Sequence, residues 1–484
     1  MSATSLAARP HRPCTARPAG PGLLVNDLHS RLNSTRVRDL RRPRTREELA
    51  TIVAQHAAQG RSLAVSGGRG AMGGQAFASG ETLLDMRSLD RVLEFDAQRG
   101  RMWVEAGIQW RALMRATAAA HVPGLPRWGV AQKQTGADQL TLGGSVAVNA
   151  HGRGLTLPPI GHHVESLEIV DPTGRVQRVG RTTRPELFSL ALGGYGLCGV
   201  VSAVELNLVP RVKVRRKVEV RSTAGLMQAF AERVQAGFTY GDFQVAIDPA
   251  RDDFLRRGVF SCYEPVADAT PLEDSRALSD ADWRGLLGLA HSAPHRAFEC
   301  YAAHYLETDG QVYWSDTHQL AGYVRDYHAE IDEHRRAAHP GSEMITELYV
   351  PRASFEPFLD DLRACLRERR AQLVYGTLRL IERDEDSFLA WAREPWICTV
   401  LNLHVEHTLP GLVKAAGQFR AAIDVALAHG GSFYLTYHRW ATAAQLRAAH
   451  PRIDAFLAAK QRLDPEGRFQ SDWYHHLQRQ LANG

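Results

Sequence analysis

Residues 141–154, TLGGSVAVNAHGRG, are so poor in large side chains that they cannot fill a core. Glycine has no side chain that would keep a ligand away from the backbone, and it reaches backbone dihedral angles that other residues avoid. A large flat ligand could therefore lie close to this backbone, and its phosphate oxygens could accept hydrogen bonds from peptide N–H groups. A glycine-rich turn at the end of a strand explains the stretch equally well when it is considered alone.

Two further loops of the same kind favour the ligand over the simple turn. Residues 67–74 (GGRGAMGG) follow a predicted strand at 62–66, and residues 193–199 (GGYGLCG) precede another at 200–209. Each loop is small, exposes its backbone and lies next to a strand end. We therefore predict that the three loops converge in space on one dinucleotide.

The first loop also contains Gly68, Gly70 and Gly73 in the GxGxxG spacing of the dinucleotide-binding fingerprint. That fingerprint should open a helix, whereas residues 74–80 resemble a loop that leads to another strand. A nicotinamide-dependent dehydrogenase of the Rossmann type is therefore the weaker interpretation.

The length and the charge of the chain limit the class of protein. Its 484 residues suggest two or three domains at roughly 150 residues each. The net charge of +5 is spread without blocks, which argues against a nucleic-acid partner. No stretch of the sequence approaches the ~18 apolar residues of a membrane-spanning helix, so we expect no membrane span.

Residues 1–30 are predicted to form a disordered N-terminal tail. Their four prolines oppose the amphipathic helix of a transit peptide, and they lack the apolar region of a secretory signal. The six cysteines are scattered without the paired spacing of a zinc site or a disulfide framework. We expect reduced thiols, no bound metal and a location in the cytoplasm.

The first part of the chain mixes helices with short strands, which predicts an α+β fold. Its clearest helix starts at Thr45, with Glu48 as the capping-box partner, and runs to about residue 59. The other elements predicted here are strands at 82–85, 92–95, 101–105, 164–170 and 176–179 and helices at 110–120 and 184–192.

The pattern changes at Pro210, where a second domain is expected to begin. Long helices at 223–235 and 354–369 then occur among strands, while residues 250–340 show no organisation that we can assign. The remaining predicted elements are strands at 345–350, 377–381, 397–404 and 432–437 and a helix at 443–461.

The order of four motifs resembles one superfamily of flavoproteins, the vanillyl-alcohol oxidase and p-cresol methylhydroxylase type. These motifs are SGGRGAMGG, TLGGSVAVNAHGRG, GGYGLCGVV and LDPEGRF, and the resemblance covers about residues 30–484. It is closest to the branch of sugar-lactone, alditol and decaprenylphosphoryl-ribose oxidases. The resemblance implies a two-domain fold in which residues 31–210 form an FAD-binding PCMH-type domain. Residues 211–430 would form an α/β substrate cap, and residues 431–484 would return to the FAD domain.

The resemblance also implies which residues contact FAD. The loop around the pyrophosphate would consist of Ser66, Gly67, Gly68, Arg69, Gly70, Ala71, Met72 and Gly73. Along the ribityl chain, the phosphates and the ring would lie Thr135, Thr141, Leu142, Gly143, Gly144, Ser145, Asn149, His151 and Gly152. On the adenine side would lie Gly199, Val200 and Val201.

One departure concerns how the flavin is attached. Many relatives carry in the first loop a histidine that bonds covalently to a ring methyl group, and the frame SGGR-x-AMGG puts Gly70 at that place. Glycine offers no nucleophile, and His151 occupies a different position. We therefore predict non-covalent FAD.

Two candidate catalytic residues lie on predicted cap strands. Relatives place an arginine on such a strand, and YGTLRLIERDEDSFLAW puts Arg379 there, although a surface arginine is the alternative. His404 shares a strand face with Asn402, so it either lines the cap cavity or is solvated. A cation such as Arg379 would stabilise negative charge that develops on oxygen.

Two further candidate catalytic residues lie near the C-terminal end of the chain. The segment YLTYHRWAT resembles the one that holds a His-Trp-Ala-Lys motif in lactone oxidases. Matching Trp440 and Ala441 puts Arg439 at the histidine and Thr442 at the lysine, so the usual pair is absent. Tyr437 and His438 are instead expected at the substrate, with His438 as proton acceptor or, alternatively, as a structural histidine.

These features predict oxidation of a hydroxylated small molecule, such as a sugar, a polyol or a related alcohol, by hydride transfer to flavin. The electron acceptor would be oxygen or another carrier. An FAD-dependent alkene reductase of the sterol-reductase type and the nicotinamide dehydrogenase are the alternatives.

Overall fold

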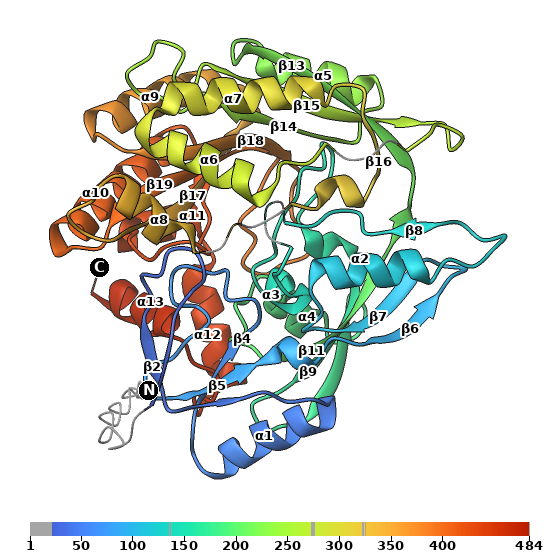
Figure 1. Cartoon of the computed structure of the whole chain (residues 1–484). Helices are drawn as coiled ribbons and strands as arrows, with labels where there is room; N and C mark the ends of the chain where they lie inside the picture. Colours follow the sequence, from blue (N-terminus) through green and yellow to red (C-terminus); the bar gives the residue numbers. More distant parts are fainter. Residues whose placement is uncertain are drawn as a thin grey trace, which may run out of the picture.

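A computed structural model describes residues 22–134, 136, 138–272, 276–321, 324 and 326–483 of the chain (Figure 1). Its strands form two groups, one before Pro210 and one after it, and helices are distributed among both. The fold therefore mixes helices and sheets, as the α+β prediction requires.

The first group of strands contains a parallel sheet and a larger antiparallel sheet. The parallel sheet has the order β3 (Asp39–Arg41), β5 (Thr82–Asp85) and β4 (Leu63–Ser66). The antiparallel sheet has the order β10 (Val176–Gly180), β9 (Val164–Val170), β11 (Val200–Asn207), β7 (Arg101–Glu105) and β6 (Val92–Asp96). Two small pairs join β1 (Leu23–Val25) to β2 (Thr35–Val37) and β8 (Trp128–Gly129) to β12 (Val209–Pro210).

Four helices pack beside these sheets: α1 (Arg46–Ala58), α2 (Trp110–Ala119), α3 (Leu142–Ala147) and α4 (Pro185–Ala191). Thr45 caps α1 as predicted, because its side chain accepts a hydrogen bond from the Glu48 amide. The Glu48 carboxylate accepts from the Arg44 amide at 2.8 Å, so it reaches one residue further back than the predicted capping box. No helix was predicted within the glycine-rich stretch, yet its first half forms α3.

The second group of strands is one antiparallel sheet of eight strands. Their order is β16 (Val312–Trp314), β13 (Lys213–Ser222), β15 (Arg257–Val266), β14 (Tyr240–Val245), β18 (Leu373–Ile381), β19 (Trp396–Glu406), β17 (Gly341–Pro351) and β20 (Ser432–Phe433). Residues 250–340, which the sequence left unassigned, supply strands β15 and β16 and helices α6 (Asp280–Ser292), α7 (Pro294–Glu307) and α8 (Tyr327–His334).

The two faces of this sheet differ in character. Paired residues share a face, and one face carries Phe260, Phe243, Leu378 and Leu348 in register across neighbouring strands. Helices α5 (Leu226–Gln235), α9 (Phe355–Glu368) and α10 (Leu409–Ala428) contribute to the large hydrophobic core to which these residues belong. The opposite face carries buried polar groups, which include Asp242, Thr377, Arg379 and Glu347.

The end of the chain packs against its beginning. Leu63 of β4 donates from its amide to the Arg468 carbonyl at 2.6 Å, and the Gln470 amide donates back to the Leu63 carbonyl at 2.9 Å. The predicted strand at 432–437 is limited to β20. The predicted helix at 443–461 is divided into α11 (Ala443–Ala449) and α12 (Ile453–Leu463), because Pro451 between them has no amide hydrogen. The last helix, α13 (Asp472–Ala482), follows.

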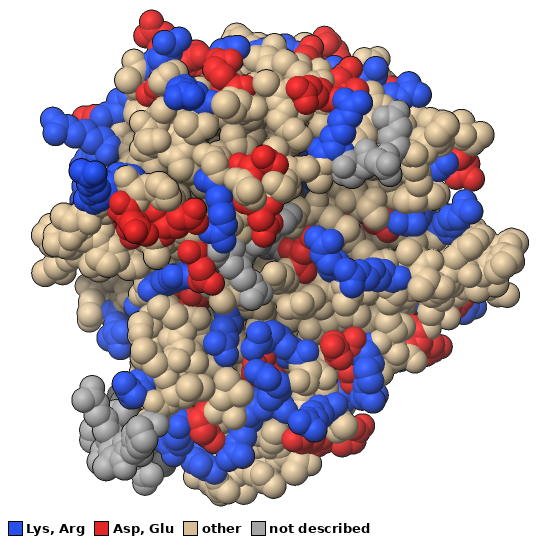
Figure 2. Space-filling view, viewed as in Figure 1, with Lys and Arg blue, Asp and Glu red and all other residues tan. Residues whose placement is uncertain are grey.

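Basic and acidic side chains are mixed across the face drawn in Figure 2. Among the described helices, none has the length and apolar character needed to cross a membrane. Cys198, Cys262, Cys300, Cys365 and Cys398 are all free thiols.

Candidate active site

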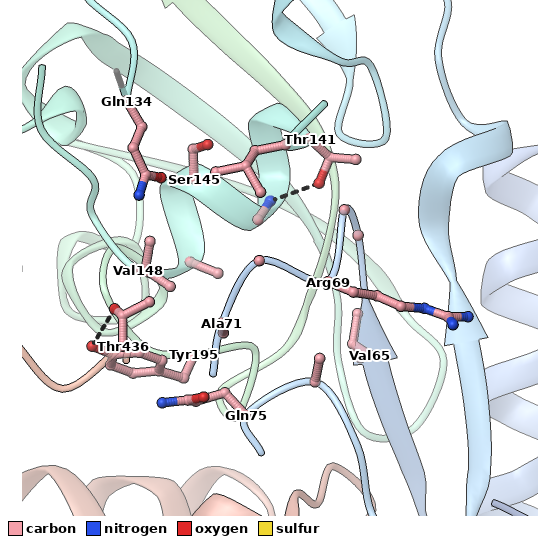
Figure 3. A pocket seen from close by; sticks show the side chains of 17 residues that line it. Val65, Arg69, Ala71, Gln75, Gln134, Thr141, Ser145, Val148, Tyr195 and Thr436 are labelled. Carbon is pink, nitrogen blue, oxygen red and sulfur yellow. Dashed lines mark hydrogen bonds between the residues drawn. The ribbon is translucent and has the colours of Figure 1, made fainter. Parts of the chain in front are cut away.

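A pocket lies where the first glycine loop meets α3, Tyr195 and Thr436, the last of which is near the C-terminal end of the chain (Figure 3). The predicted residues that line it are Gly67, Gly68, Arg69, Gly70, Ala71, Thr141, Gly144 and Ser145. The lining residues that were not among the predicted FAD contacts are Val65, Gln75, Ala76, Gln134, Leu140, Ala147, Val148, Tyr195 and Thr436. Of these, Ala147 and Val148 belong to the second glycine-rich stretch and Tyr195 to the third. Loops from three separate parts of the chain therefore meet at one cavity.

The glycines of the first loop are needed for close packing as well as for an open backbone. A Cβ atom on Gly68 would lie 2.6 Å from the Gln139 carbonyl oxygen, and one on Gly70 would overlap the Leu140 side chain. The loop is thus pressed against the segment that leads into α3, and larger residues would push the two apart.

Four consecutive amides of this loop are free to bind an anion. In the described part of the chain, the N–H groups of Gly68, Arg69, Gly70 and Ala71 have no acceptor. Arg69 has a φ of 56°, in the left-handed region, which turns the backbone at this point. Adjacent free amides in such a turn form a typical binding site for phosphate oxygens.

The start of α3 differs, because its amides are already used. The amides of Leu142 and Gly143 donate to the carbonyls of Ile108 and Ala106 at 2.8 and 2.7 Å, and the Gly144 amide donates to Thr141 Oγ1 at 3.2 Å. The first loop therefore fits the phosphates of a dinucleotide better than the helix start does. The small residues of α3 leave room for the rest of the ligand.

The other predicted cofactor contacts do not line this pocket. Asn149 donates from its side chain to Asp384 at 2.9 Å and accepts from the Gly161 amide at 2.8 Å, so both ends of its amide group are used. The remaining residues outside the pocket lining are Ser66, Met72, Gly73, Leu142, Gly143, His151, Gly152, Gly199, Val200 and Val201. Thr135 lies outside the described residues.

A chain of hydrogen bonds connects the pocket to the polar face of the eight-stranded sheet. Gln134, which lines the pocket, donates to the Tyr437 hydroxyl at 3.0 Å, and that hydroxyl donates to Glu347 Oε1 at 3.0 Å. The other carboxylate oxygen accepts from the Tyr349 hydroxyl at 2.7 Å and lies 2.8 Å from His151 Nε2. Tyr437 therefore contacts the pocket lining through Gln134, and its carboxylate partner is Glu347, which the sequence did not indicate.

The surroundings of Glu347 and Tyr437 determine the protonation states within this chain of hydrogen bonds. Burial opposes ionisation of Glu347, but the adjacent His151 and the hydrogen bonds from His151 and Tyr349 hold the pKa of Glu347 below its ordinary value. Burial and the Glu347 carboxylate raise the pKa of the Tyr437 hydroxyl well above its ordinary value. At neutral pH Glu347 is thus a carboxylate, and Tyr437 keeps its proton.

Arg379 is a buried cation that forms no ion pair among the described residues, and its charge helps to lower the pKa of Glu347 on the same sheet face. It is 6% exposed, and in the described part of the chain its guanidinium has no hydrogen bond or ion pair. It faces the same side of the sheet as Glu347, because Arg379 pairs with Cys398, which pairs with Tyr349. A buried charge without a partner is costly, so its presence indicates that a bound group completes its contacts.

Lys133 is a second buried cation that the sequence did not indicate. Its ammonium group lies 2.8 Å from Asp138 Oδ1 and donates to the Gln134 carbonyl at 2.8 Å. Burial lowers the pKa of Lys133 to about 8, although Asp138 raises it. Nearby polar atoms without a described hydrogen-bond partner are Asp242 Oδ1, Thr377 Oγ1 and Arg153 Nε. This face of the sheet is thus rich in donors and acceptors that a polar ligand could satisfy.

His438 lies on the other side of the sheet from Tyr437. Its Nε2 atom is 3.4 Å from Thr346 Oγ1, and its ring is stacked on Phe433 and contacts Phe419 of α10 edge-on. Burial lowers the pKa of His438 to about 3. The structure therefore gives this histidine the packing role that was the alternative in the sequence analysis, and it does not bring His438 to the pocket.

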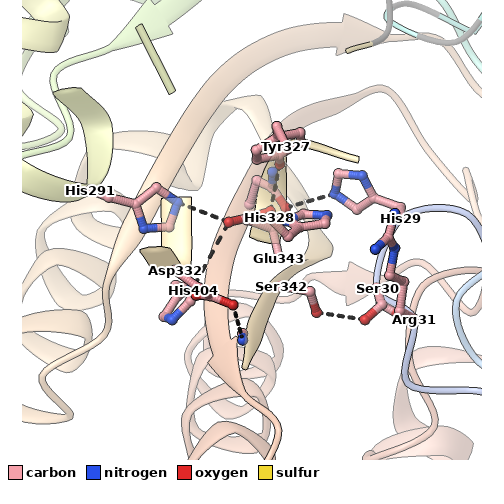
Figure 4. A network of polar contacts seen from close by, with 12 residues as sticks. His29, Ser30, Arg31, His291, Tyr327, His328, Asp332, Ser342, Glu343 and His404 are labelled. Atoms are coloured by element: carbon pink, nitrogen blue, oxygen red, sulfur yellow. Dashed lines mark hydrogen bonds and ion pairs between the residues drawn. The ribbon is translucent and has the colours of Figure 1, made fainter. Parts of the chain in front are cut away.

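His404 also lies apart from the pocket. Its Nδ1 atom is 3.8 Å from Glu343 Oε1, within a cluster of histidines at the far end of β17 (Figure 4). The sequence placed it correctly on a strand face with Asn402, but that face is buried here by α6 and α8.

Comparisons with known proteins agree with this geometry. Residues 39–180 match a family model described as an FAD binding domain. The chain is 24% identical to the L-gulono-1,4-lactone dehydrogenase of Mycobacterium tuberculosis (strain ATCC 25618 / H37Rv) over 438 residues, which is 89% of this chain and 94% of that protein. It is 25% identical over 462 residues to the alditol oxidase of Streptomyces sp. (strain IKD472 / FERM P-14339), covering 91% and 95% of the two chains.

A third relative is the decaprenylphosphoryl-beta-D-ribose oxidase of Mycolicibacterium smegmatis (strain ATCC 700084 / mc(2)155). It is 23% identical over 441 residues, covering 86% of this chain and 90% of that protein. The amides of the first loop that have no acceptor among the described residues fit the phosphates of FAD.

Proposed function

Because the chain is an FAD-dependent oxidoreductase acting on CH–OH groups, we propose that its substrate is a polyhydroxylated small molecule, such as a sugar lactone, a sugar or a polyol. The observation that carries this proposal is the buried Arg379 guanidinium without a partner, on a polar sheet face next to the pocket. A ligand with several hydroxyl groups satisfies both donors and acceptors on such a face. Bound FAD supplies the acceptor for the hydride.

We assign Arg379 to charge stabilisation. Its guanidinium is positioned to stabilise negative charge that develops on the substrate oxygen as the C–H bond breaks. Water is excluded from this buried face, so the interaction is stronger there than at the surface.

We assign Tyr437 and Glu347 to holding the substrate hydroxyl and its proton. Tyr437 keeps its hydroxyl proton and directs it toward Glu347 at 3.0 Å. The tyrosine oxygen is then available as an acceptor for a second donor, a position that the Gln134 amide occupies at 3.0 Å. A substrate hydroxyl that replaces the Gln134 contact would be oriented by this pair. His438 and His404 have no part in this proposal.

The loop contacts of FAD are proposed to be those of residues 67–71 with its phosphates and of Thr141, Gly144 and Ser145 along the rest of the molecule. Non-covalent attachment remains our prediction, because Gly70 has no side chain that could bond to the flavin. Acid precipitation should release the yellow colour into the supernatant, and colour left in the pellet would contradict the prediction.

The electron acceptor is proposed to be oxygen or another carrier, and reoxidation of the reduced protein with and without air separates the two. A cytoplasmic location remains a prediction that rests on the scattered free cysteines. The division into an FAD domain of residues 31–210 with 431–484 and a cap of residues 211–430 is likewise proposed.

The experiment that tests the function is an anaerobic screen of sugar lactones, sugars, polyols and simple alcohols. The proposal expects loss of the oxidised-flavin absorbance with polyhydroxylated compounds and little change with alcohols that carry one hydroxyl. If only reductants bleach the flavin, and an alkene then reoxidises the reduced flavin, the alkene reductase would be favoured.

A further inference from the structure

A second group of buried titratable side chains lies at the far end of the polar sheet face, away from the pocket (Figure 4). Glu343 of β17 is 1% exposed, and three histidines surround it. They come from separate elements, since His291 ends α6, His328 lies on α8 and His404 lies on β19. The proposed catalysis uses none of them.

The distances within this group match those between the ligands of one metal ion. Glu343 Oε1 lies 2.9 Å from His291 Nε2 and 3.8 Å from His404 Nδ1, and all three atoms lie within 4.8 Å of one another. Four ligands at 2.0–2.1 Å around a tetrahedral zinc ion are separated by about 3.3 Å. An ion therefore fits between these three atoms after small movements of the side chains.

Two ring nitrogens in the group lack the hydrogen bonds that a simple ion-pair network would give them. His328 Nδ1 lies 2.8 Å from Glu343 Oε2, yet within the described residues it has no hydrogen bond of acceptable geometry. His404 Nδ1 is also buried without a described hydrogen-bond partner. His328 is 5% exposed, so water does not satisfy its nitrogen from the surface.

The surroundings supply the outer contacts that metal ligands need. The Tyr327 hydroxyl donates to Glu343 Oε2, which leaves Oε1 as the oxygen that faces His291 and His404. His291 Nδ1 lies 3.3 Å from the Gln372 side-chain amide, and turning that amide would let its oxygen accept the Nδ1 proton. Such outer hydrogen bonds fix the tautomer of a ligating histidine.

Arg335 is the group that competes with a cation here. Its Nη1 atom lies 3.2 Å from His291 Nδ1 and 3.5 Å from His404 Nε2, so its positive charge is next to the site. Arg335 is exposed, so its guanidinium can move into solvent when a metal ion binds. A cation site beside a displaceable arginine binds more tightly once that arginine is removed.

We propose that His291, Glu343 and His404 form a zinc site that joins helix α6 to strands β17 and β19, with His328 beside the second carboxylate oxygen of Glu343. A set of imidazole nitrogens with one carboxylate oxygen binds zinc in preference to magnesium or calcium. With three protein ligands, the fourth position of a tetrahedral ion would be taken by water. The sequence argument against a metal considered only the cysteines, and these histidines are too far apart in the chain to form a spacing motif.

The test uses full-length protein without a polyhistidine tag, treated with a chelator and then titrated with zinc against a coloured chelator. The wild type should bind about one zinc ion per chain, and zinc should raise its thermal midpoint. Glu343→Gln and His404→Asn should weaken zinc binding by about tenfold or more, because loss of even an outer contact costs 10- to 100-fold. Arg335→Gln should tighten it.

His429→Gln is the matched control, because His429 lies 2.8 Å from Asp361 on the surface and has no further described metal-ligand neighbour. Its zinc affinity should equal that of the wild type, and the FAD absorbance should be the same in all the proteins. Zinc binding that survives Glu343→Gln and His404→Asn, or a wild-type midpoint that zinc leaves unchanged, would overturn the proposal. If the variants do not fold, X-ray absorption of the zinc-loaded wild type decides, since sulfur or water ligands alone would also overturn it.

Discussion

Glu343 and Glu347 lie on the same face of β17, and each has a histidine nitrogen within 2.8–2.9 Å of its carboxylate, yet the two regions differ in chemistry. Around Glu347 the other partners are the hydroxyls of Tyr349 and Tyr437, which donate to this carboxylate, and the Cys398 thiol, whose Sγ atom lies 4.0 Å from Oε2. Around Glu343 they are further imidazoles, which can offer lone pairs to a metal.

The difference shows that a buried glutamate beside a histidine has no fixed role. Its neighbours on adjacent strands decide whether the carboxylate orients a proton donor or joins a set of metal ligands. The pocket adds to the contrast, because Glu347 is connected to it through Tyr437 and Gln134, whereas Glu343 faces helices α6 and α8.

The largest effect is expected from Arg379→Ala, which removes the cation on the Glu347 side. Turnover should fall about 100-fold, as loss of a charge-stabilising donor typically does. FAD content should be unchanged, because Arg379 lies on the eight-stranded sheet and does not line the pocket. Turnover with saturating substrate and the flavin spectrum are the measurements. Arg383→Ala, at an exposed position just after β18, is the control, and wild-type turnover in Arg379→Ala would remove this residue from the mechanism.

Glu347→Gln should have the next largest effect, because it keeps the shape of the side chain but removes its charge. We expect turnover to fall roughly tenfold, less than the ~100-fold that loss of a direct proton-transfer group costs. The zinc content of this variant should match the wild type, which separates the two regions. Glu406→Gln, exposed at the end of β19, is the control. An unchanged turnover would mean that Tyr437 does not need the carboxylate.

Gly68→Ala tests the loop that is proposed to bind the phosphates of FAD next to the Glu347 region. Its Cβ atom would lie 2.6 Å from the Gln139 carbonyl oxygen, and such overpacking costs about 1–3 kcal/mol. The loop must shift, so FAD affinity should fall about tenfold, measured by flavin fluorescence on dilution. Gly417→Ala in α10, where a Cβ atom meets nothing within 4 Å, should keep the wild-type affinity. Equal affinities would show that the loop position is not critical.

The smallest effect is expected from His438→Phe, on the apolar face of the sheet. Turnover and its pH profile should be unchanged, because His438 only packs there. Folded His438 stays neutral down to about pH 3, whereas an unfolded histidine takes up a proton below about pH 6.5. The wild type therefore loses stability as the pH falls below that value, and the variant should lose less, as denaturation at several pH values would show. A changed pH profile of turnover would restore His438 to the mechanism.

The sequence alone was sufficient for the cofactor and for the class of reaction. The order of the four motifs predicted an FAD-binding domain in the branch of sugar-lactone, alditol and decaprenylphosphoryl-ribose oxidases, and the comparisons confirm that resemblance. Glycine loops can be predicted from the sequence because their function depends on the absence of large side chains from consecutive residues. Helix α1 and strands β9 and β11 were readable for a similar reason, since caps and alternation are local patterns.

Only the tertiary structure decided which polar side chains meet. Tyr437 and His438 are neighbours in sequence, but they lie on opposite sides of the eight-stranded sheet. Glu347, Lys133 and the histidines around Glu343 gave no local signal, because their partners come from distant segments. A strand alternates its side chains between two faces whatever its residues are, so register and neighbouring strands determine which face is the reactive one.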